Sequence, residues 1–170
     1  MPVCVRRVPA FFAAAFDAVT VATLRPDLWT SWRDVLTLSG ISSTTLVDSP
    51  PSDPRAWAYE IKFDGYRLMT RVDGADIKLF TRNGIDWTPK LGPLHKAIAK
   101  TKLPAGWYDG EMVTLDDNGV PDFGALQLSF DAAKTKDVVL YLFDLPYFDR
   151  HDLRAVPLRE RRALLQGLLE

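Results

Sequence analysis

The chain has 170 residues, a hydrophobic fraction of 47%, a charged fraction of 25% and a formal net charge of -1. These values are typical of a soluble globular domain with enough chain to bury a core, and they exclude a globally basic nucleic-acid-binding protein. The single cysteine, Cys4, excludes an internal disulfide and indicates a reducing, cytoplasmic location. No apolar run reaches the ~18 residues that span a bilayer, so no membrane partner is expected.

Residues 1–43 are predicted to be a helical segment whose role the sequence does not indicate. Apolar residues recur at helical spacing over 11–24, and a second helix is expected to begin at Asp27 and to end at Gly40. The polar, proline-rich residues 42–55 predict a linker. The rest of the chain is expected to form a different domain.

The stretch after the linker predicts a strand, because apolar and charged residues alternate from Trp57 onward. With a period of two, Glu60, Lys62 and Asp64 fall on one face. Two interpretations are open at this point. The face is either a solvated surface with cross-strand ion pairs, or it holds a nucleophilic lysine between orienting carboxylates. The glycine that follows, Gly65, permits a sharp turn or a close backbone approach.

Two further strands are predicted at 67–72 and 77–81, joined by a turn at Asp73-Gly74. Together with the preceding strand they are expected to form an antiparallel meander with Lys62 at its entrance. Arg82 follows on a turn. Its guanidinium is either an exposed corner of a hairpin or a bidentate clamp for a phosphate.

A helix is predicted over 91–100, and a mostly apolar strand over 107–115. Glu111 lies within that strand, and a carboxylate in such a position needs a partner, which a buried ion pair with a scaffold arginine would supply. The residues 116–119 predict the turn that ends the strand.

Asp122 is expected to cap a short helix, and the apolar run 138–145 predicts a fully buried strand. Phe143 lies in this run, where most aromatic side chains belong to a core. A last helix is predicted to begin at Pro157, and the chain stops at Glu170 within it.

Four groups of residues in this order resemble the motifs of the adenylation (nucleotidyltransferase) domain of ATP-dependent DNA ligases. They are Glu60-Ile61-Lys62-Phe63-Asp64-Gly65-Tyr66-Arg67, Arg82-Asn83-Gly84, Asp109-Gly110-Glu111 and Leu142-Phe143-Asp144. The amino-acid sequence of these motifs is most similar to that of the ligase domain of bacterial end-joining ligases, and the resemblance covers residues 44–170. It implies an α+β fold, an ATP-grasp-like nucleotidyltransferase domain in which antiparallel sheets with flanking helices enclose an ATP cleft.

The resemblance also implies the chemistry. The Lys62 amine would attack the α-phosphate of ATP to form lysyl-AMP, and AMP would pass to the 5′-phosphate of a DNA nick that the 3′-hydroxyl then seals. ATP and Mg²⁺ are the implied cofactors. Nicked or broken double-stranded DNA is the implied partner, and an end-binding repair protein is a candidate second partner. The family's roles carry over as Glu60 at the adenine amino group, Arg67 at the ribose, Arg82 at a phosphate, Phe143 stacked on adenine, and Glu111 at the ribose or the metal.

Three features of the family are absent from the sequence: a later Glu-Gly motif, a paired-lysine motif and a β-barrel. The resemblance therefore predicts a C-terminally truncated domain. Two alternatives stay open. One is an RNA ligase or capping-type nucleotidyltransferase, which shares Lys-x-Asp-Gly; the other is a non-catalytic remnant that binds a nucleotide or a partner protein.

Overall fold

The computed structural model describes residues 64–131, 135 and 137–169, together with three strands before them. The chain divides into two compact units. The first takes in residues 1–20 and 42–63, and the second takes in 21–41 and 64–170. Each unit has a sheet of its own.

The first unit contains a three-stranded antiparallel sheet in the order β2-β1-β3. Its strands are β1 (Val3–Arg7), β2 (Thr45–Leu46) and β3 (Trp57–Ile61). The prediction of a helical segment over 1–43 is wrong at β1, where valines favour a strand and β3 supplies the pairing. The helices expected at 11–24 and from Asp27 lie outside the described residues.

The prediction that the strand beginning at Trp57 forms a meander with the next two strands is wrong, because β3 has a different partner. This strand pairs with β1, in the register Cys4 opposite Glu60, and not with β4. It ends at Ile61, so the exposed Asp64 lies in the coil before β4 and not on the strand face expected for it. Lys62 and the side chain of Glu60 lie outside what the structure describes.

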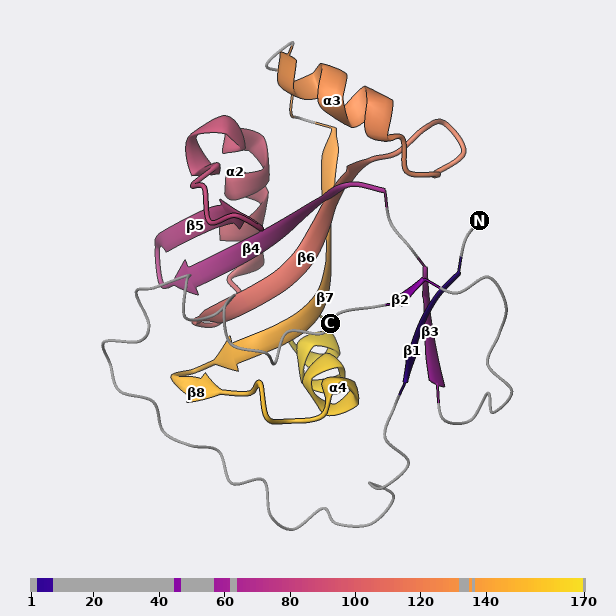
Figure 1. The fold of residues 1–170 in the computed structure, drawn as a ribbon. Helices are drawn as coiled ribbons and strands as arrows, with labels where there is room; N and C mark the ends of the chain where they lie inside the picture. The colour runs from indigo at the N-terminus through magenta and orange to yellow at the C-terminus, as the bar shows by residue number, and fades with distance from the viewer. Residues whose placement is uncertain are drawn as a thin grey trace. The chain divides into compact units, whose positions relative to one another are not determined.

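The second unit is built on a five-stranded antiparallel sheet in the order β5-β4-β6-β7-β8 (Figure 1). Its strands are β4 (Tyr66–Asp73), β5 (Asp76–Thr81), β6 (Gly106–Thr114), β7 (Val138–Phe148) and β8 (His151–Asp152). The hairpin predicted at Asp73-Gly74 is confirmed, because Asp73 pairs with Asp76 and Gly74 has a φ of 60°. That positive φ is the conformation for which glycine is suited.

In the described part of this unit, three α-helices and one short 3₁₀ helix accompany the sheet, and Figure 1 labels the three α-helices. They are η3 (Thr88–Lys90), α2 (Gly92–Thr101), α3 (Phe123–Asp131) and α4 (Leu158–Leu169). The predicted cap of α3 is confirmed, because the Ala125 N–H donates to Asp122 Oδ1 at 2.9 Å. In the described part of the chain, no helix has the length and apolar character needed to cross a membrane.

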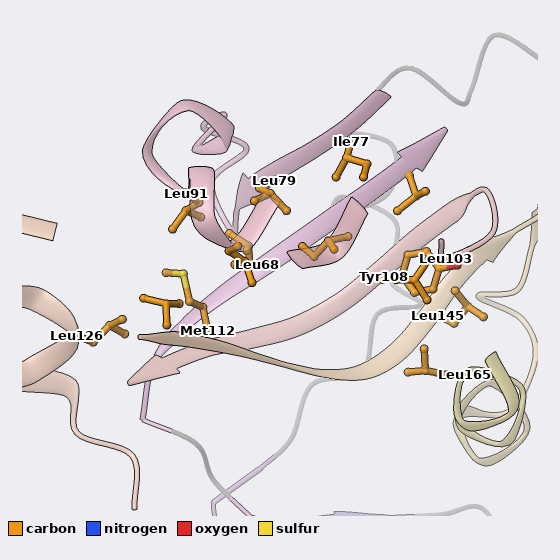
Figure 2. Close-up of a cluster of buried hydrophobic side chains, with 14 of the residues drawn as sticks. Leu68, Ile77, Leu79, Leu91, Leu103, Tyr108, Met112, Leu126, Leu145 and Leu165 are labelled. Atoms are coloured by element: carbon orange, nitrogen blue, oxygen red, sulfur yellow. The ribbon is translucent and has the colours of Figure 1, made fainter. Parts of the chain in front are cut away.

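The core of the second unit runs along the sheet and beneath the helices (Figure 2). Leu126 of α3 lies beside Met112 of β6 at one end, and Leu165 of α4 lies beside Leu145 of β7 at the other (Figure 2). Alternate residues of β4, Leu68 and Val72, face this core. The apolar period of two thus explains why one face of the sheet is covered.

The prediction that β7 is fully buried is wrong for its first half. Val139 and Tyr141 are both 36% exposed, whereas Asp144 to Tyr147 are buried. The neighbouring strand β8 is only two residues long and pairs with Tyr147 and Phe148. Val139 and Tyr141 lie on the same face of β7, and an antiparallel sheet commonly leaves one face open to water.

Candidate functional site

An ion pair between β4 and β6 lies at the centre of the candidate site. The Arg67 Nε donates to Asp109 Oδ1 at 2.9 Å, and Nη2 makes a second bond to Oδ2. The Asp109 side chain is fully buried, while that of Arg67 is 26% exposed. A two-pronged contact of this kind fixes the plane of the guanidinium.

Burial and the opposite charge of the partner have opposite effects on the pKa values of Asp109 and Arg67. Burial raises the pKa of Asp109, against the hydrogen bond and charge of Arg67, which lower it. Burial alone would lower the pKa of Arg67, but the hydrogen bond and charge of Asp109 outweigh it and raise the pKa above its ordinary value. Arg67 therefore remains a cation at any physiological pH.

Glu111 faces Arg67 in the strand register, but its hydrogen-bond partner is a backbone amide. The N–H of Gly65 donates to Glu111 Oε1 at 3.1 Å. Burial raises the pKa of Glu111, and the Gly65 bond and the charge of Arg67 act against that rise. The expected need for a partner is met, by a main-chain group in place of a scaffold arginine.

Gly65 makes the close backbone approach that the sequence predicts. A Cβ at this position would lie 2.2 Å from the carbonyl oxygen of Met112 and 2.8 Å from Val113 Cγ1. Only a residue without a side chain fits there unless the backbone moves. The contact holds the entrance of β4 against β6, three residues after Lys62 in the chain.

Phe143 occupies an irregularity in the pairing of β6 with β7. Asp144 lies opposite Asp109 and Leu142 opposite Gly110, so β7 has one residue more than β6 between these pairs, and that residue is Phe143. Its side chain is partly exposed, and Arg67 Cζ lies 5.9 Å from the ring centroid. A β-bulge commonly redirects a side chain next to a functional site.

A second buried ion pair, which the sequence did not predict, lies next to this bulge. The Nε and Nη2 of Arg161 donate to the two carboxylate oxygens of Asp144, each at 2.7 Å. Both side chains are almost fully buried. The signal for it was an arginine at helical spacing among the leucines of α4, since a buried charge needs an opposite charge.

Arg82 lies on the predicted turn and is exposed. It follows Thr81, which is opposite Leu68, so it is at the same end of the sheet as Arg67. The turn is compact: the N–H of Gly84 donates to the Thr81 carbonyl at 2.8 Å. The structure thus brings Arg67, Glu111 and Phe143 together, with Arg82 at the same end of the sheet. Lys62 and the side chain of Glu60 lie outside the described residues.

The side chains of this region suit a metal ion whose other ligands come from a bound substrate. Among the described residues, no cluster of three or more His, Cys, Asp or Glu side chains is present. Glu111 contributes one carboxylate, of which Oε1 binds Gly65. Mg²⁺ in nucleotide sites is commonly held by one or two carboxylates plus the substrate's phosphates, so these residues fit Mg²⁺ bound to a nucleoside triphosphate.

Comparison with known proteins gives consistent results. Residues 45–170 match the family model described as the ATP dependent DNA ligase domain. The multifunctional non-homologous end joining protein LigD of Pseudomonas aeruginosa is 51% identical over 126 residues, which is 74% of this chain and 15% of that protein. A probable DNA ligase of Rhodococcus jostii is 31% identical over 94% of this chain and 32% of its own length.

Solved structures agree with the sequence relatives. The crystal structure of the ligase domain of Mycobacterium tuberculosis LigD has a TM-score of 0.53 at 34% identity, and covers 64% of this chain and 36% of that one. A mycobacterial DNA ligase D complexed with ATP and MES has the same TM-score and identity. The chain spans well under half the length of these relatives. The predicted fold class and the resemblance to end-joining ligases are confirmed, and the chain belongs to the family of ATP-dependent DNA ligase domains.

Proposed function

We propose that this chain works as the adenylation part of an ATP-dependent DNA ligase in DNA repair and end joining. The observation that carries the proposal is the group formed by Arg67, Glu111 and Phe143. It combines a fixed cation, a carboxylate and a partly exposed ring at one place on the sheet. A nucleotide requires these three kinds of partner for its ribose and phosphates, its metal and its base.

The proposed reaction begins at Lys62. Its deprotonated Nζ attacks the α-phosphorus of ATP, so that an N–P bond forms while the bond from phosphorus to the pyrophosphate oxygen breaks. The amine proton passes to solvent, and pyrophosphate leaves with both electrons of the broken bond. AMP then passes from Lys62 to the 5′-phosphate at a DNA nick, and the 3′-hydroxyl displaces it to join the strand.

The roles of the remaining residues follow their chemistry. Phe143 stacks on adenine, Arg67 binds the ribose, and Arg82 binds a phosphate from its exposed turn. Glu60 accepts a hydrogen bond from the adenine amino group. Glu111 holds the entrance of β4 through Gly65 and offers its carboxylate to the ribose or to Mg²⁺. When bound, Mg²⁺ would neutralise charge on the phosphates.

The partners follow from this reaction. Nicked or broken double-stranded DNA is the proposed substrate, and an end-binding repair protein is a proposed second partner. Both assignments rest on the similarity to end-joining proteins. The location that we propose is the cytoplasm, where ATP and thiols in reduced form occur together.

Transfer of label from ATP tests the proposal. The chain is incubated with Mg²⁺ and ATP labelled at the α-phosphate, and label retained on denatured protein is measured. We expect labelling of the wild type and of Lys78→Ala, and no labelling of Lys62→Ala. Lys78 is the matched control because it lies on β5 with its Nζ 3.8 Å from Asp86. A labelled Lys62→Ala protein or an unlabelled wild type contradicts the proposal. Label taken from GTP in preference to ATP favours a capping-type enzyme instead.

A further inference from the structure

The carbonyl of Phe143 is held by a side chain of α4. Phe143 is the extra residue of the bulge, so the regular exchange of hydrogen bonds between β6 and β7 is interrupted there. A backbone carbonyl in such a place needs another donor. Arg162 supplies it, since its Nε donates to the Phe143 oxygen at 2.9 Å.

The residue next in the chain is held by the same helix. Arg161 binds both carboxylate oxygens of Asp144, and its Nη1 donates to the carbonyls of Leu153, Arg154 and Val156 at 3.4, 3.3 and 2.6 Å. The Leu145 N–H in turn donates to Asp144 Oδ1 at 2.7 Å. The bulge is therefore fastened at Phe143 by Arg162 and at Asp144 by Arg161.

The two arginines differ in their surroundings. Arg161 is 2% exposed and satisfies several buried groups, so its loss would disturb the fold as a whole. Arg162 is only half-buried, and its Nε donates to the backbone carbonyl of Phe143. Removal of Arg162 would free the Phe143 carbonyl, and it would disturb the packing between α4 and β7 less than removal of the buried Arg161 would.

We propose that Arg162 is a positioning residue for the nucleotide base, which acts by fixing the backbone from which the Phe143 ring projects. The proposal rests on the function proposed above, in which Phe143 stacks on adenine. It assigns α4 a role in binding the nucleotide through the bond from Arg162 to the Phe143 carbonyl. Phe143 therefore contacts two arginines: Arg67 Cζ lies 5.9 Å from the centroid of its ring, and Arg162 Nε donates to its backbone carbonyl.

The test compares ATP with inorganic tripolyphosphate, which lacks the base, by calorimetry on the full chain. Arg162→Met keeps the length of the side chain and removes the donor. Arg159→Met is the matched control, because Arg159 is an exposed arginine of the same helix. We expect Arg162→Met to weaken ATP binding about fivefold and to leave tripolyphosphate binding unchanged, since one hydrogen bond is lost. Arg159→Met should bind both as the wild type does, and Arg162→Lys, which keeps a donor, should recover part of the loss.

A double-mutant cycle shows whether Arg162 acts through the ring. If it does, Arg162→Met should cause no further loss of ATP affinity in a Phe143→Leu background. An equal loss in both backgrounds, an equal loss for ATP and tripolyphosphate, or no loss at all overturns the inference. If the wild type binds no ATP, the proposed function is contradicted and the inference with it. If the wild type binds ATP with the same affinity as Arg162→Met, only the inference is contradicted.

Discussion

Arg67 and Asp109 are 42 positions apart in the chain and form a two-pronged ion pair across neighbouring strands. The carboxylate is fully buried and the guanidinium is 26% exposed. The buried Asp109 carboxylate thus holds the Arg67 cation at the surface of the sheet. Because Arg67 also lies over the Phe143 ring, this anchor determines where two proposed nucleotide contacts meet.

Loss of the buried charge should destabilise the protein. Asp109→Asn leaves the Arg67 cation without its counter-charge. We therefore expect the free energy of unfolding in urea to fall by about 3 kcal/mol. This value is at the lower end of the range for breaking a buried ion pair, because Arg67 is partly exposed. Asp76→Asn is the control, since Asp76 pairs with Arg71 but is 55% exposed. It should cost no more than ~1 kcal/mol. Equal effects of the two substitutions would show that burial does not govern this pair.

The raised pKa of Glu111 makes part of the stability dependent on pH. A carboxyl whose pKa is higher in the folded state stabilises that state fully below its unfolded pKa, ordinarily 4.5, and this contribution is lost as the pH rises through the folded value. Glu111→Gln abolishes the titration and keeps an oxygen for the Gly65 N–H.

We therefore expect Glu111→Gln to gain stability relative to the wild type as the pH rises from 4.5 toward neutrality. Urea unfolding at a series of pH values measures the difference. Asp117→Asn, in the exposed turn after β6, is the control for the loss of one carboxylate. A difference between Glu111→Gln and wild type that is constant with pH would contradict the raised pKa.

A methyl group at Gly65 should disturb the entrance of β4. Its Cβ would lie 2.2 Å from the Met112 carbonyl oxygen, so the backbone must move and the bond to Glu111 must weaken. We expect Gly65→Ala to lower the midpoint of unfolding by the equivalent of about 1–3 kcal/mol. In Gly167→Ala the added Cβ meets nothing within 4 Å in α4, and this control should stabilise by about 0.5–1 kcal/mol. A neutral Gly65→Ala would argue against the close packing.

Replacement of the Phe143 ring should affect the nucleotide more than the fold. Phe143→Leu roughly conserves apolar volume and should cost under ~1.5 kcal/mol of stability. ATP affinity should fall about tenfold, because stacking on a base contributes ~1–3 kcal/mol. Phe80→Leu, which removes a ring stacked on Trp107 at 5.7 Å, should leave ATP binding unchanged. Equal ATP affinity in Phe143→Leu and wild type would remove Phe143 from the site.

The sequence by itself determined the local elements of the second unit. The turn at Asp73-Gly74, the cap at Asp122 and the start of α4 after Pro157 all depend on residues within a few positions of one another. Turn and cap chemistry act over such distances, so one sequence is enough to predict them. The order of the motifs likewise indicated the ligase family, which the comparisons confirm.

Tertiary structure alone decided how these elements combine. β3 pairs with β1 instead of β4, Glu111 binds the amide of Gly65 instead of an arginine, and Phe143 is placed by a bulge. Each outcome depends on strand register and on partners far away in the chain. A period of two predicts which residues share a face but not which strand lies alongside, because every register consistent with that period presents the same pattern. The partners of the buried charges could therefore be known only once the sheet was assembled.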